Sequence, residues 1–121
     1  MLTNLISATG FDLRLQLARP IDRLTGPVGR RVRRNRSKIR AIVADHGARN
    51  LRLFGSVARG DDRPDSDVDL LVDLRPGTGL LALARLQADL EAVLDARVDL
   101  VAPGDLKPNV RRRIERDLVT L

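Results

Sequence analysis

The chain has 121 residues, of which 43% are hydrophobic and 31% are charged, so its composition predicts one small globular domain rather than a disordered chain. The absence of cysteine excludes disulfides, thiolate zinc sites and cysteine nucleophiles. Aromatic residues make up only 2%, which argues against stacking of single-stranded nucleic acid on aromatic rings. Because no apolar run reaches membrane-spanning length and residues 1–17 lack a signal-peptide pattern, we expect a cytoplasmic protein with no membrane partner.

Positive charge is concentrated in the first half of the chain. Residues 1–50 hold 11 Lys and Arg against 3 Asp, a net charge of +8, whereas residues 51–121 hold 11 against 13 Asp and Glu, a net charge of −2. The densest part runs from Arg30 to Arg36. We favour the solvated face of a helix, or a rim for an acidic protein partner, over contact with a nucleic-acid backbone, which the run also allows.

Residues 1–26 are weakly patterned. Leu2, Leu5 and Ile6 suit a short helix, and the leucines at 13, 15 and 17 alternate as in a strand. This segment faintly resembles the closing helix and strand of an Xre-type helix-turn-helix domain. We therefore expect residues 1–28 to be an N-terminal extension, as a remnant of such a domain, and residues 29–121 to form the main domain.

The pattern sharpens from Pro27, where apolar residues at helical spacing predict one helix that ends at His46, before Gly47. A loop with three aspartates (Asp61, Asp62 and Asp65) is expected to stay open to water. The other predicted elements are strands at 51–54, 67–74 and 97–101, a helix at 80–94, and a last helix from about Pro108 whose apolar stripe extends to Leu121. This order predicts an α/β (α+β) fold, a small mixed β-sheet flanked by helices.

Three aspartates on two predicted strands are the candidate metal ligands. Asp67 and Asp69 share one face of a strand, about 7 Å apart at ~3.3 Å per residue, and two uncompensated carboxylates repel each other. A divalent cation removes that conflict, and Mg²⁺ prefers carboxylates together with substrate phosphates. Asp99 can join them if its strand lies alongside, and two metal ions could then act together. Asp73 lies about 13 Å beyond Asp69, too far to share this cluster.

Gly55 and Ser56, ten residues before Asp67, suit the phosphate half of the same site. Glycine allows a tight turn and close backbone approach, and a short helix that opens at Ser56 would direct free N–H groups at a triphosphate. The Ser56 hydroxyl adds a donor, and Arg59 lies one turn further on, within reach of phosphate or acceptor.

The pattern Gly-Ser, ten residues, Asp-x-Asp and a later lone strand aspartate resembles the DNA polymerase β-like nucleotidyltransferase superfamily. The segment Gly55 to Leu74, GSVARGDDRPDSDVDLLVDL, is similar to the minimal nucleotidyltransferase (MNT) antitoxins, and the resemblance covers residues 29–121. It implies two Mg²⁺ ions and ATP as substrate, with Asp67 and Asp69 binding both metals. It also implies that Asp99 binds one metal and helps to deprotonate the acceptor, and that Gly55 and Ser56 hold the triphosphate.

The same resemblance implies a partner. Many MNT proteins pair with a HEPN-type toxin ribonuclease and transfer AMP to one of its tyrosines. The chain itself contains no tyrosine, so it cannot modify itself on one. Two alternatives stay open: a non-catalytic antitoxin that masks the toxin by binding, and a DNA-binding regulator that uses the basic N-terminal half. The oligomeric state, homo- or hetero-oligomer, is also open.

Overall fold

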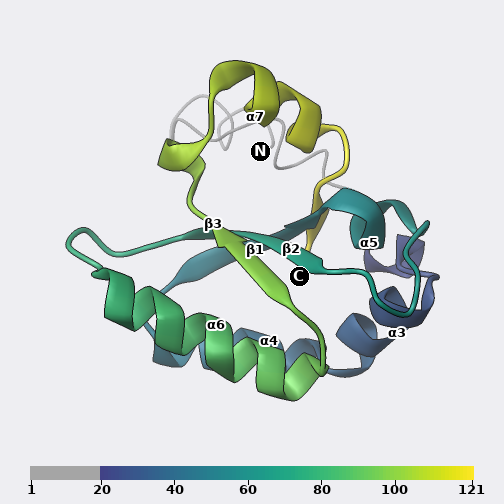
Figure 1. Cartoon of the computed structure of the whole chain (residues 1–121), viewed down its shortest axis with the longest axis horizontal. Coiled ribbons are helices and arrows are strands. Elements are labelled where there is room, and N and C mark those ends of the chain that lie inside the picture. Colours follow the sequence, from purple (N-terminus) through teal and green to yellow (C-terminus); the bar gives the residue numbers. More distant parts are fainter. Residues whose placement is uncertain (1–19) are drawn as a thin grey trace, which may run out of the picture.

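The structure is a computed structural model that describes residues 20–121, and the elements predicted within residues 1–19 lie outside this range. Figure 1 shows a sheet with helices on both of its sides. The chain order is η1 (Ile21–Arg23), α3 (Pro27–Arg34), α4 (Arg36–Asp45), β1 (Arg49–Phe54), α5 (Gly55–Arg59), β2 (Val68–Asp73), α6 (Leu80–Leu94), β3 (Val98–Val101), η2 (Pro103–Asp105), α7 (Pro108–Glu115) and β4 (Val119–Thr120). None of the helices within residues 20–121 has the length and apolarity needed to cross a membrane.

The four strands form one mixed sheet in the order β3-β2-β1-β4, which confirms the predicted fold class. β1 runs antiparallel to both of its neighbours, whereas β2 and β3 are parallel, because α6 connects them as a crossover helix. The predicted strands at 67–74 and 97–101 and the helix at 80–94 all occur, the helix with the same ends.

One face of the sheet forms the hydrophobic core. Leu53 and Leu70 are paired across β1 and β2 and are fully buried. The helices α4 and α6 lie side by side and cover this face of the sheet (Figure 1). Leu86, Leu90 and Leu94 face the core at helical spacing from α6. The Nε2 atom of His46, at the end of α4, lies 2.9 Å from an Asp89 carboxylate oxygen on α6, so His46 links the two helices.

The predicted single helix from Pro27 to His46 is wrong, because the chain breaks at Asn35. Asn35 has φ −102° and ψ 13°, outside the helical region, and it ends α3 and begins α4. Its amide side chain donates to the Arg31 carbonyl at 2.9 Å, and its own carbonyl accepts from the Ile39 N–H at 2.9 Å. Asn35 thus ends one helix and begins the next, and its side chain bonds back to α3, which apolar periodicity does not reveal.

The predicted last helix is also too long. α7 ends at Glu115, and the leucines at 118 and 121, expected on its stripe, are instead buried on either side of β4. Val119 pairs with Leu53 of β1, and the Leu121 N–H donates to the Leu51 carbonyl at 3.1 Å. The segment after Asp117 therefore pairs with the otherwise open edge of β1, and this tertiary pairing makes it a strand rather than a helix.

The expectation that all three loop aspartates face water fails at Asp62. This side chain is 8% exposed, and its Oδ2 accepts from the backbone N–H groups of Val28 at 2.8 Å and Gly29 at 3.0 Å. Asp62 therefore caps α3 from 34 residues away, and a Cβ at Gly26 would overlap its carboxylate. Leu24 and Val28 are both fully buried in the common core.

Candidate active site

Asp69 and Asp99 lie directly opposite each other on the parallel strands β2 and β3. Because side chains alternate along a strand, Asp69 points away from the face that buries Leu70, and therefore toward the side of the sheet where Figure 1 shows α7. Asp69 is half-buried and Asp99 is exposed. The structure thus brings together two of the three predicted carboxylates, on the face opposite the hydrophobic core.

The pKa of Asp69 is raised from 3.8 to about 6. Burial is the largest cause, followed by the negative charge of Asp99, a hydrogen bond with Asp99 and the charge of Asp67. Both other predicted carboxylates therefore act on Asp69. The positive charge of Arg59 lowers the pKa of Asp69 but does not offset these effects.

Gly55 places the backbone of α5 against the Asp69 carboxylate. Its φ is +78°, which a residue with a side chain rarely adopts, and an ideal Cβ there would overlap the Asp69 Oδ2 atom. α5 begins at Gly55, so the short helix predicted beside Ser56 is present, and the N–H groups of its first turn lack partners within the helix. Gly55 and Ser56 therefore lie where a phosphate chain could approach the carboxylates.

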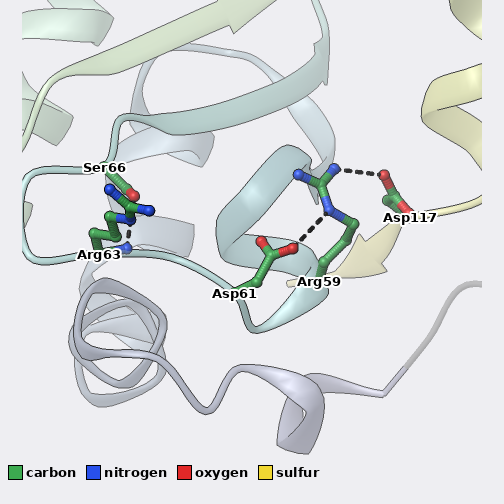
Figure 2. Close-up of polar contacts among 5 residues, drawn as sticks. All are labelled: Arg59, Asp61, Arg63, Ser66 and Asp117. Carbon is green, nitrogen blue, oxygen red and sulfur yellow. Dashed lines mark hydrogen bonds and ion pairs between the residues drawn. The ribbon is translucent and has the colours of Figure 1, made fainter.

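Arg59, at the end of α5, is held by two carboxylates (Figure 2). Its Nη1 lies 3.0 Å from Asp117 Oδ2, and its Nε lies 3.3 Å from Asp61 Oδ2. The hydrogen bond with Asp117 is the largest cause of a raised Arg59 pKa. Sequence reasoning missed Asp117, since it lies 58 residues away and no local pattern marks it. The role of Arg59 in binding phosphate stays a prediction.

The loop between α5 and β2 is closed by a contact that Figure 2 also shows. The Arg63 N–H donates to the Ser66 hydroxyl oxygen at 2.8 Å, which fixes the loop immediately before Asp67. Ser66 thus shapes the approach of the chain to the site through the backbone.

Asp73 belongs to a different set of contacts on the same strand. The Arg52 Nη2 atom lies 2.9 Å from Asp73 Oδ1, and the Arg52 side chain is 8% exposed. Asp73 therefore has its own cation. A hollow of about 450 Å³ between α4 and the β1–β4 edge, lined in part by Arg40, Leu51 and Leu121, contains none of the predicted site residues. The paired carboxylates, and not this hollow, identify the candidate site.

The carboxylates of Asp69 and Asp99 offer oxygen ligands of the kind that bind a magnesium ion. Asp69 and Asp99 lie opposite each other on neighbouring strands, and the negative charge of Asp99 raises the pKa of Asp69, so a bound cation would relieve this repulsion. Hard oxygen donors on rigid strands are the ligands that Mg²⁺ prefers. Within residues 20–121, however, no three Asp, Glu, His or Cys side chains are arranged as a ready metal site, so the two-metal cluster stays a prediction.

Comparison with known proteins identifies the class of enzyme. A family model described as the nucleotidyltransferase domain matches residues 36–121. The chain belongs to this family and is a nucleotidyltransferase.

Relatives within the family narrow the identification. The protein adenylyltransferase MntA of Thermococcus cleftensis is 42% identical over 73 residues, which cover 60% of this chain and 74% of the relative. A solved minimal nucleotidyltransferase is 44% identical with a TM-score of 0.67, over 74% of this chain and 92% of that one. A crystal structure of a toxin-antitoxin with AMP-PNP is 25% identical with a TM-score of 0.63, over 71% of each chain. The resemblance to minimal nucleotidyltransferases is thus confirmed.

Proposed function

We propose that this chain uses magnesium to transfer AMP from ATP to a tyrosine of a HEPN-type toxin, and so acts as the antitoxin of that toxin. The observation that carries the proposal is the pair Asp69 and Asp99, opposite each other on β2 and β3, with the Gly55 backbone against Asp69. The relatives named as a protein adenylyltransferase and as a toxin-antitoxin with AMP-PNP support the acceptor class and the nucleotide. Since the chain has no tyrosine, a tyrosine acceptor lies on another molecule.

The proposed division of labour follows the geometry. Gly55 and Ser56 bind the β- and γ-phosphates through the first turn of α5, which orients the α-phosphate toward the carboxylates. Asp67 and Asp69 would hold the magnesium, which when bound neutralises charge on the phosphates. A bound magnesium would also relieve the repulsion that Asp99 exerts on Asp69.

In the transfer step, the tyrosine oxygen forms a bond to the α-phosphorus while the bond from that phosphorus to pyrophosphate breaks. The tyrosine hydroxyl loses its proton, and Asp99, the exposed carboxylate of the pair, accepts it. AMP-tyrosine and pyrophosphate are the products. An acceptor that approaches Asp99 has access from solvent, whereas Asp69 lies deeper, as its half-buried state indicates.

The test is intact-mass spectrometry of the product of the neighbouring gene, after incubation with this chain, ATP and magnesium. We expect a mass gain of one or more AMP groups, and peptide mapping should place it on tyrosine. The gain should vanish with Asp67→Asn/Asp69→Asn and persist with Asp65→Asn, an exposed loop carboxylate that controls for loss of charge. A stable complex without any mass gain would instead support an antitoxin that masks the toxin, and would refute the proposal.

A further inference from the structure

The basic run of α3 and α4 divides into arginines with structural partners and arginines without them. Arg31 Nη1 donates to the carbonyls of Leu94 at 2.9 Å and Asp95 at 3.0 Å, and so ties α3 to the end of α6. Arg36 donates to the Leu121 carbonyl at 3.4 Å. The structure therefore accounts for two members of the run through packing and backbone contacts.

The remaining three, Arg30, Arg33 and Arg34, form what we call the α3 arginine patch. All three are exposed and line one hollow of about 390 Å³. Among residues 20–121, none of the three has an ion pair or a hydrogen-bond partner for its guanidinium group. Their direction is fixed, because Val28 and Val32 on the opposite side of α3 are fully buried in the core.

The sequence around the patch leaves its charge uncompensated. From Arg23 to Ala44 the chain has eight Lys and Arg and no acidic residue, and Asp62, which reaches the start of α3, is buried and already bonded to backbone. Three neighbouring cations that have no ion-pair partner within residues 20–121 suit an external polyanion.

We infer that the α3 arginine patch binds the phosphate backbone of a double-stranded nucleic acid, a function independent of nucleotidyl transfer. The exposed residues of α3 are all arginine, so the patch offers none of the aromatic or aliphatic side chains that usually anchor the centre of a protein interface. Interfaces with nucleic acid are instead polar and positive, and backbone contact needs only such cations. The chain's two aromatic residues leave little for base stacking, which favours a duplex over a single strand.

The position of the patch relates it to the active site. α3 packs against α5, the helix that begins at Gly55 beside Asp69. A duplex on the patch would therefore lie along the flank of the domain next to the catalytic elements, without occupying the face that carries Asp69 and Asp99.

The test measures binding of the full chain to labelled DNA and RNA duplexes of one sequence by fluorescence anisotropy, across a salt series. Arg30→Gln/Arg33→Gln/Arg34→Gln should weaken binding at low salt by roughly 10-fold or more. It should also reduce the slope of log K against log salt by about 3, at about 0.9 per phosphate contact. The two duplexes distinguish DNA from RNA as the natural source of the backbone. Should the triple variant fail to fold, Arg30→Gln and Arg34→Gln singly should each reduce the slope by about 1.

The matched control is Arg111→Gln/Arg112→Gln/Arg113→Gln, which removes the same charge from exposed positions on α7. We expect it to retain most of the binding. Equal losses in the two triple variants would overturn the inference, because net charge alone would then explain the affinity. Patch-dependent binding to polyglutamate without binding to either duplex would also overturn it, in favour of an acidic protein.

Discussion

Replacing Asp69 by Asn should stabilise the metal-free protein at neutral pH, although Asp69 is central to the proposed activity. The folded-state pKa of about 6 lies above the ordinary 3.8, so folding favours the protonated form of this carboxyl. The stability that the protonated form contributes is present below pH 4 and is lost as the pH rises through 6. Asn keeps a neutral side chain of similar shape at every pH, and so it avoids this loss.

The size of the effect follows from the pKa values. A rise from 3.8 to about 6 corresponds to about 3 kcal/mol at 1.36 kcal/mol per pKa unit, as an upper limit. Because Asp69 is half-buried, solvent screens part of the repulsion, and we expect about 1 kcal/mol, or roughly 4 °C in Tm.

Thermal unfolding at pH 4 and pH 7.5, with a chelator present, measures this difference. Asp69→Asn should gain about 1 kcal/mol over the wild type between the two pH values, whereas Asp65→Asn, in the exposed loop, controls for loss of one negative charge. If the wild type loses no more stability than Asp69→Asn between pH 4 and pH 7.5, the result would refute the electrostatic description of the site.

Three further predictions test other contacts of the site and fold. Gly55→Ala should lose more stability than Gly77→Ala in urea unfolding. Both glycines have positive φ, so an alanine at either position costs about 1 kcal/mol of folding stability. Only at Gly55 would the added Cβ also overlap Asp69, whereas Gly77 has open space around it. Equal losses in the two variants would contradict this prediction. Asp62→Ala should lower the free energy of unfolding by about 2 kcal/mol, because it removes two hydrogen bonds to the start of α3. A loss as small as that of Asp65→Ala would show that the cap contributes little. Magnesium should raise the Tm of the wild type and not that of Asp67→Asn/Asp69→Asn; the same rise in both would place the ion elsewhere.

The elements with strong local patterns could be predicted from the sequence. Alternation around Leu70 and the leucine stripe of α6 predicted β2 and α6. The sequence made the role of Asp99 conditional on its strand lying alongside β2, and the structure supplies the parallel pairing that aligns Asp99 with Asp69. The break at Asn35 depends on side-chain and backbone hydrogen bonds that interrupt an otherwise continuous apolar stripe.

Residues that act over long sequence distances could not be predicted in the same way. β4 exists because β1 has an open edge, and Leu118 and Leu121 fit a helical stripe equally well until that pairing is known. Asp62 and Asp117 are acidic residues in polar surroundings, and only the fold shows that one caps α3 and the other holds Arg59. Local patterns thus located the candidate carboxylates but not the contacts that surround them.

The central claim, that the carboxylates on β2 and β3 perform nucleotidyl transfer, is tested most directly by two substitutions on one strand. Asp69 and Asp73 share a strand face, but Asp73 is paired with Arg52 and Asp69 lies against Asp99 and Gly55. The measurement is incorporation of AMP from ATP labelled at the α-phosphate into the partner protein. The account predicts that Asp69→Asn abolishes incorporation while Asp73→Asn, confirmed as folded, retains it. Retained transfer in Asp69→Asn would contradict the account.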